Sequence, residues 1–104
     1  MPSDATAIPQ RSSIMKLQYQ TYWTDPAQQD ANLKWIDGFY GDMYGPGGPR
    51  PDGTLDGAYV NYPDVDLPDW QHLYYQGGYP RLQRTKARWD PRNVFHHAQS
   101  IELP

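Results

Sequence analysis

The stretch IMKLQYQTYW, residues 14–23, decides which fold this 104-residue chain is expected to adopt. Its side chains alternate in character along the chain. One face is mostly apolar and carries Met15, Leu17, Tyr19, Thr21 and Trp23. The opposite face offers a cation, two amides and a phenol, at Lys16, Gln18, Gln20 and Tyr22. Alternation with a period of two predicts a half-buried β-strand whose apolar face packs against a helix layer.

Helical patterns and turn signals lie on both sides of this strand. Residues 1–13 before it are polar and contain two prolines, so they predict an arm. After it, Asp25-Pro26 is typical of a helix start, and the helix is expected to run to about Tyr44. A second strand, GAYVNY at 57–62, precedes two short helices and an extended tail, at about 68–76, 80–89 and 94–104.

This order of elements predicts an α+β fold, a small antiparallel sheet with flanking helices. The aliphatic core is thin, because Leu, Ile, Val and Phe together make up only 16 of the 104 residues. Four Trp and nine Tyr nevertheless distinguish the chain from a disordered polar segment. Since a lone pair of strands is marginal in water, we expect either an aromatic core or cover from another polypeptide. Self-association would supply that cover symmetrically.

Composition narrows the class of protein. The chain has no cysteine, which removes disulfides and thiolate metal sites but leaves the compartment open. No apolar run reaches the ~18 residues of a membrane span. Residues 1–11 lack the apolar stretch of a secretory signal, which favours a cytoplasmic location. The formal net charge of -3 predicts neither a nucleic-acid nor a membrane partner.

The two predicted strands carry the candidate catalytic groups. Lys16 and Gln18 project from the first strand, and Tyr59, Asn61 and Tyr62 lie on the second. A tyrosine near a cation can act as a base, but strands also use tyrosine for packing alone. Because Tyr59 and Tyr62 are three residues apart, an ideal strand points them to opposite faces. Both reach one cavity only if the chain bends, bulges or ends before Tyr62.

Three other clusters are better explained by structure than by chemistry. Asp64, Asp66 and Asp69 lack the later glutamate and the glycine of a calcium-binding loop, so cap and turn roles are expected. His96 and His97 lie on the tail without a third ligand, and no metal site is predicted. The basic side chains near the last helix predict a solvated face or an acidic partner rather than nucleic acid. They are Arg81, Arg84, Lys86, Arg88 and Arg92.

Longer motifs point to a known family. AYVNYPDVDLPDW at 58–70 is followed by YYQGGYPRLQRTKARWDPRNVFHHAQSI at 74–101, and KLQYQTYW at 16–23 precedes both. Over about residues 8–104, this succession resembles the C-terminal segment of the berberine bridge enzyme family of FAD-linked oxidoreductases. The resemblance implies a polar arm, 1–13, and a berberine-bridge-enzyme-like C-terminal domain, 14–104. That domain would correspond to the C-terminal part of a substrate domain and to the following segment, which returns to the FAD-binding domain.

The resemblance implies a substrate-pocket portion, or a subunit, of a FAD-dependent oxidoreductase. In that family, hydride passes from an alcohol-type or natural-product substrate to the flavin. FAD is then expected to be held mainly by a FAD-binding domain or subunit outside these residues. By motif position, Lys16 and Gln18 would line the substrate cavity, and Tyr59 and Tyr62 would be the catalytic pair. Tyr62 is favoured as the base, with Lys16 stabilising its phenolate.

The same resemblance implies that Asn61 and Tyr79 contact the cofactor. The sequence departs from the family at Gly78, where Asn is usual, and it offers no carboxylate on the Lys16 strand, where some members place a catalytic acid. Two alternatives follow. The chain would be a flavin-free module that binds or cyclises a small molecule, standing alone as a homo-oligomer, or it would be a non-catalytic interaction domain.

Overall fold

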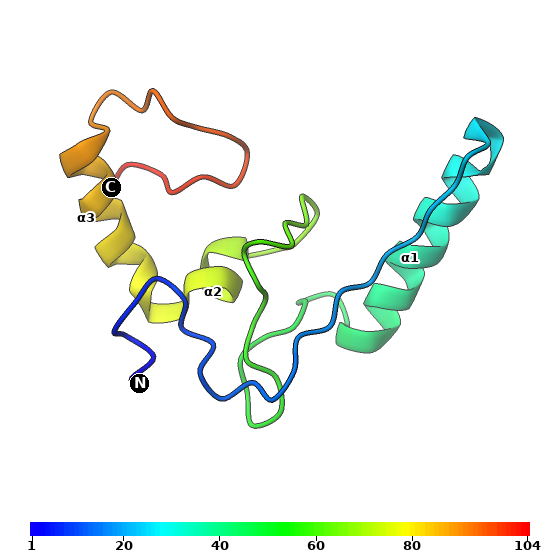
Figure 1. Cartoon of the computed structure of the whole chain (residues 1–104), viewed down its shortest axis with the longest axis horizontal. Helices are drawn as coiled ribbons and strands as arrows, with labels where there is room; N and C mark the ends of the chain where they lie inside the picture. The colour runs from blue at the N-terminus through cyan, green and yellow to red at the C-terminus, as the bar shows by residue number, and fades with distance from the viewer.

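The computed structural model describes all residues from Met1 to Pro104 and contains helices but no β-strand. In chain order, the elements are η1 (Pro26–Gln28), α1 (Gln29–Tyr44), α2 (Trp70–Tyr75), η2 (Gln76–Gly78) and α3 (Tyr79–Trp89), where η denotes a 3₁₀ turn. The backbone of α1 lies apart from those of α2 and α3, whereas α2, η2 and α3 pack against one another (Figure 1). None of the helices has both the length and the apolar character required to cross a lipid bilayer.

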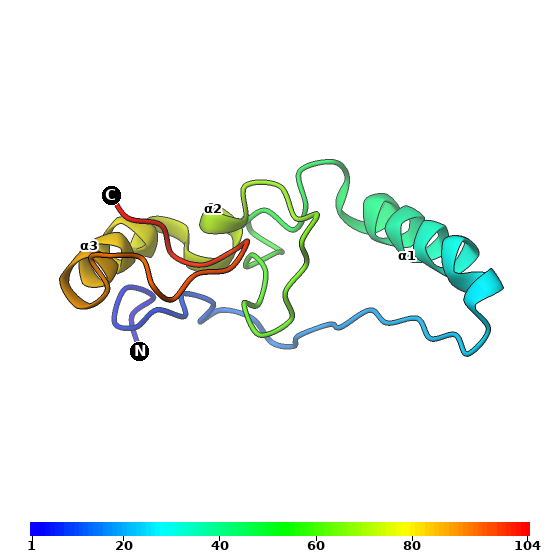
Figure 2. The same ribbon diagram turned by 90° about the horizontal axis from the view of Figure 1, so that it is seen from above.

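The prediction of an α+β fold with a small antiparallel sheet is wrong. Residues 14–23 are extended, but no neighbouring strand pairs with them (Figure 2). They run antiparallel along α1 and contact it through side chains only. The hydroxyls of Tyr19 and Tyr44 lie 2.8 Å apart, and Thr21 donates to Asn32 at 2.6 Å. A strand requires backbone bonds to a neighbour, so the alternating pattern indicated an extended backbone for which the chain supplies no partner.

The second predicted strand, 57–62, is also absent because the chain turns at its end. The backbone amide of Tyr62 donates to the carbonyl of Tyr59 at 2.9 Å and closes a turn. Before the turn, Ala58 donates to the carbonyl of Leu73 at 2.9 Å, which ties this segment to α2 rather than to a strand. The segment therefore lies against a helix end.

The helices follow their sequence signals closely. The carboxylate of Asp25 accepts a hydrogen bond from the amide of Ala27 at 3.0 Å, which confirms the predicted cap. At the other end of α1, Gly45 adopts a φ of 68° and terminates the helix, as expected. Helix α2 is shorter than predicted because Asp69 has a φ of 49°, which excludes it from a right-handed helix.

The buried core is small and lies around α2. Leu67, Leu73 and Tyr74 are the only buried hydrophobic side chains, and Tyr40 is the one residue of α1 that packs against them. The accessible surface is 7692 Å² for a mass of 12.0 kDa. A folded monomer of this mass exposes about 6,000 Å². The radius of gyration of 15.9 Å also exceeds the ~13 Å of a compact chain of this length.

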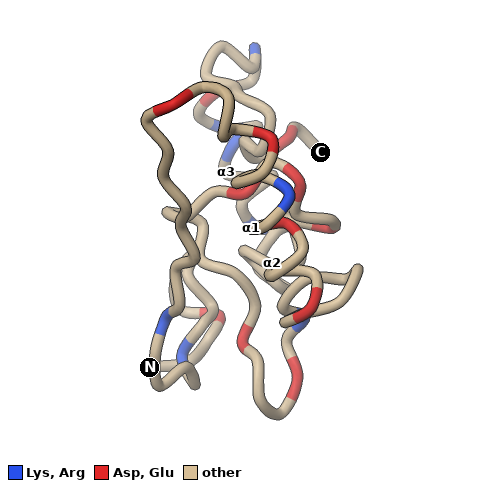
Figure 3. Tube along the Cα trace, turned by 90° about the vertical axis from the view of Figure 1, so that its right-hand side faces the viewer, with Lys and Arg blue, Asp and Glu red and all other residues tan.

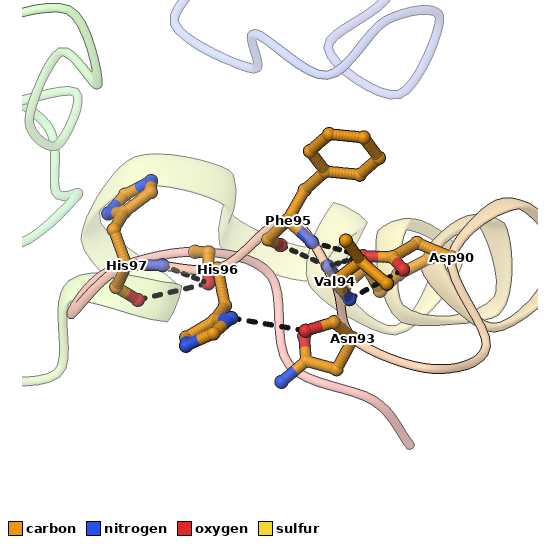
Figure 4. A network of polar contacts seen from close by, with 8 residues as sticks. Asp90, Asn93, Val94, Phe95, His96 and His97 are labelled. Carbon is orange, nitrogen blue, oxygen red and sulfur yellow. Dashed lines mark hydrogen bonds and ion pairs between the residues drawn. The ribbon is translucent and has the colours of Figure 1, made fainter.

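Both ends of the chain are tied to this core. Gln10, within the predicted polar arm, is buried, and so is Gln99 in the tail. The amide nitrogen of Gln99 donates to the carbonyl of Asp64 at 2.5 Å. The tail is anchored by Asp90, whose carboxylate accepts the amides of Val94 and Phe95 at 2.8 and 3.0 Å (Figure 4).

Acidic and basic positions are scattered along the trace rather than gathered into one stripe (Figure 3).

Candidate functional site

An open cleft of about 960 Å³ lies between the α1 side of the molecule and the loop that precedes α2. The extended segment 14–19, the inner face of α1 and the loops 52–59 and 61–65 line it. Five of the six residues predicted to act in function line this cleft: Lys16, Gln18, Tyr59, Asn61 and Tyr62. The structure therefore brings together residues from two predicted strands that do not pair.

The turn at 59–62 places both tyrosines on the same side. Their rings lie 5.2 Å apart and nearly perpendicular, at 89°. The side-chain amide of Asn61 donates to the hydroxyl of Tyr59 at 2.7 Å. The side chain of Lys16 approaches from the extended segment, with its ammonium 4.5 Å from the centre of the Tyr59 ring. This distance is typical of a cation–π contact.

Tyr59 and Tyr62 have different surroundings in the cleft. Tyr59 is engaged by Lys16 at its ring and by Asn61 at its hydroxyl. The hydroxyl of Tyr62 has no hydrogen-bond partner, and the residue is 43% exposed. The ammonium of Lys16 lies over the ring of Tyr59, whereas the sequence interpretation had paired Lys16 with Tyr62. Of the two phenols, that of Tyr62 is open to a ligand.

Three further tyrosines, Tyr19, Tyr40 and Tyr44, form one wall of the cleft. Tyr19 makes edge contacts with the rings of Phe39 and Tyr40, at 5.1 and 6.1 Å. Burial, followed by the charge of Asp64, raises the pKa of Tyr40 to about 12. Burial and the hydrogen bond with Tyr19 also raise the pKa of Tyr44. The phenols of Tyr40 and Tyr44 therefore stay protonated at neutral pH and do not act as bases.

Tyr79, the sixth predicted site residue, lies outside the cleft. It begins α3 and packs against Trp70 and Tyr75, each with ring centres 5.9 Å away. Its hydroxyl accepts the backbone amide of Glu102 at 3.2 Å, so it holds the tail against α3. Within this chain, Tyr79 has a packing role, and Gly78 before it ends η2.

The lining of the cleft does not fit a complete FAD. Lys16 is the only cationic side chain among the lining residues, whereas Asp37, Asp52, Asp56 and Asp64 contribute carboxylates. A dinucleotide carries a pyrophosphate, which proteins hold with helix N-termini, backbone amides or basic groups. The charges here repel such a group. The cleft lining therefore provides no site for the phosphates of FAD.

Comparison with known proteins identifies the class of protein. Residues 58–102 match the family model described as berberine and berberine like. The chain is 49% identical, over its whole length, to aclacinomycin-N/aclacinomycin-A oxidase from Streptomyces galilaeus. It is 46% identical, over 94% of its length, to hexose oxidase from Chondrus crispus. It spans about a fifth of each relative, 21% in both cases.

Solved structures contain the same arrangement. A glycopeptide hexose oxidase complexed with teicoplanin superposes with a TM-score of 0.92 and 45% identity, covering 98% of this chain and 23% of that one. GilR, an oxidoreductase that catalyses the terminal step of gilvocarcin biosynthesis, gives a TM-score of 0.91 with 40% identity, covering 99% and 23%. The open shape is therefore also found inside longer chains. Residues 58–102 match the berberine and berberine-like family, and the chain as a whole is similar to a segment of longer oxidases.

Proposed function

We propose that this chain forms the substrate side of the active site of a FAD-dependent oxidoreductase. The supporting observation is the convergence of Lys16, Gln18, Tyr59, Asn61 and Tyr62 on one cleft. The relatives are named as an aclacinomycin oxidase, a hexose oxidase and a glycopeptide hexose oxidase. By this likeness, an alcohol-type or natural-product substrate would occupy the cleft. The flavin, which accepts the hydride, is held by residues outside this chain.

Within the cleft, Tyr62 is the candidate base. Its unpartnered hydroxyl oxygen, as the phenolate, accepts the proton of a substrate hydroxyl. Asn61 and Lys16 hold Tyr59 beside it, so that Tyr59 orients the substrate rather than receiving its proton. Gln18 lines the same cleft and offers an amide to hydroxyl groups. We also propose that Asn61 approaches the flavin, since it lies in the turn beside both tyrosines.

The surface that this chain leaves exposed supports the presence of a binding partner. It exposes about 1,700 Å² more than a self-contained monomer of its mass, and a standard stable interface buries 1,200–2,000 Å². Part of this excess lies on α1, where Trp35, Phe39 and Met43 follow one another at four-residue intervals and are 58%, 38% and 51% exposed. We propose that the FAD-binding portion of the enzyme supplies the cover.

The test is anaerobic reduction of the flavin by substrate in the flavin-bound enzyme that contains these residues. Tyr62→Phe is expected to slow reduction by about 10²-fold or more, the usual loss for a missing general base. Tyr22→Phe is the matched control, because Tyr22 is 79% exposed and lies outside the cleft. Reduction at the wild-type rate in Tyr62→Phe would remove Tyr62 from the role.

A second measurement tests the partner. Purified enzyme is expected to be yellow, with a mass that includes the FAD-binding portion. A colourless, stable homo-oligomer of this chain that binds a small molecule in the cleft would instead establish the flavin-free alternative. A well-packed monomer without a pocket would establish the interaction domain.

A further inference from the structure

We propose that Gln10 and Asp56 are positioning residues that set Lys16 against the ring of Tyr59. The proposal rests on the proposed function for its catalytic meaning, because the Lys16–Tyr59 contact lies in the proposed substrate cleft. It concerns a network that no motif in the sequence indicates. We call this network the N-terminal splint and define it as Gln10, Ser12, Ser13 and Asp56.

The first half of the splint is the buried side chain of Gln10. Its amide nitrogen donates to the carbonyls of Ala58, Leu73 and Tyr74 at 3.0, 3.3 and 3.0 Å. The amide oxygen has no partner. Turning the amide over would place that oxygen against three carbonyl oxygens, so the donating orientation is strongly preferred. One side chain thus joins the arm, the last turn of α2 and the residue immediately before Tyr59.

The second half is the carboxylate of Asp56. One of its oxygens accepts four hydrogen bonds, two from the backbone amides and two from the hydroxyls of Ser12 and Ser13, at 3.1–3.2 Å. Partial burial acts to raise the pKa of Asp56, but the hydrogen bonds from Ser13 and Ser12 outweigh it and lower that pKa. The carboxylate is therefore ionised at neutral pH and holds the chain three residues before Lys16.

The two halves fix the two sides of the Lys16–Tyr59 contact. Gln10 holds Ala58, the residue before Tyr59, and Asp56 holds Ser13, close before Lys16. Beyond the splint, residues 14–18 are exposed and have no backbone hydrogen bonds to the rest of the chain. The relative position of Lys16 and Tyr59 is therefore determined largely by the splint. A displacement of about 1 Å at a catalytic group is enough to cost ~10²-fold in rate.

The experiment follows Lys16 directly in the flavin-bound enzyme. Reductive ¹³C-methylation of the lysines keeps their charge, and the resonance of Lys16 is identified by its loss in Lys16→Arg. Because the ammonium lies over the Tyr59 ring, we expect an upfield ring-current shift of this resonance. Asp56→Ala and Gln10→Ala are expected to move it toward the position of an exposed lysine and to lower kcat by about tenfold or more.

Asp56→Asn is the conservative variant, because it keeps an acceptor oxygen for Ser12 and Ser13 and should restore most of the shift. If Asp56→Ala fails to fold, the double variant Ser12→Ala/Ser13→Ala decides the outcome. It removes the two hydroxyl donors, keeps the two backbone donors, and is expected to give an intermediate shift. A wild-type Lys16 resonance in folded Asp56→Ala, or in the double variant, would overturn the proposal.

The same data separate this proposal from the proposed function. If Tyr62→Phe reduces its flavin normally while the splint variants move the Lys16 resonance, the splint stands and the assignment of the base fails. If Tyr62→Phe is slow and the resonance stays fixed in the splint variants, the base stands and the splint fails.

Discussion

Replacement of Gly57 by alanine is expected to destabilise the segment that carries Tyr59. Gly57 has a φ of +84°, a conformation that costs an alanine about 1–2 kcal/mol. An added Cβ atom would lie 2.4 Å from the carbonyl oxygen of Leu73, which is far inside contact distance. That oxygen accepts the amides of Ala58 and Gln10, at 2.9 and 3.3 Å. Displacing it weakens two hydrogen bonds worth about 0.5–1.5 kcal/mol each.

The expected loss in local stability is therefore about 3 kcal/mol. At ~1.4 kcal/mol per factor of ten, the amide of Ala58 should exchange with solvent about 100-fold faster in Gly57→Ala. Hydrogen–deuterium exchange of the peptide that spans 57–62 measures this directly. Gly53→Ala is the matched control, because Gly53 has no positive φ and its added Cβ would meet nothing within 4 Å. Equal exchange in the two variants would refute the reasoning.

Two other changes test how the core and the tail are held. Leu73→Ala removes a fully buried side chain from a core of three and should cost about 2–5 kcal/mol, measured as a fall in the melting temperature of the segment. Asp90 has its pKa lowered to about 2, mainly by the hydrogen bond from Lys86. A lowered pKa stabilises the folded state above pH ~4, and this contribution is lost as the pH falls toward ~2. The stability difference between wild type and Asp90→Asn should therefore shrink over that range, and a difference independent of pH would contradict the assignment.

Local signals in the sequence predicted the helices well. Asp25 and Gly45 mark the two ends of the long helical stretch through side-chain capping and a positive φ, and both effects act within a few residues. The sheet was wrong for a different reason. Alternation at 14–23 specifies an extended backbone, but pairing depends on a second strand that this sequence does not contain.

Part of the candidate site could be predicted from the sequence. Tyr59 and Tyr62 share the cleft because the chain turns between them, which the spacing of three residues left open. Tyr79 lies outside the cleft, and its motif position carried no information about the packing of α3 against the tail. The hydrogen bonds that Gln10 donates and Asp56 accepts join residues more than 40 positions apart, and polar residues of this kind give no periodic signal.

The open shape has a consequence for the chemistry. Tyr40 is the only residue of α1 that reaches the core, and residues 14–19 and α1 form one side of the cleft while the loop carrying Tyr59 and Tyr62 forms the other. The separation between the two sides therefore depends on the splint and on whatever covers the exposed stripe of Trp35, Phe39 and Met43. Because the same arrangement superposes on parts of two longer solved structures with TM-scores of 0.91 and 0.92, we expect this cover to hold α1 in the position seen here. Substitutions on that stripe should then change KM at the cleft, although none of these side chains lines it.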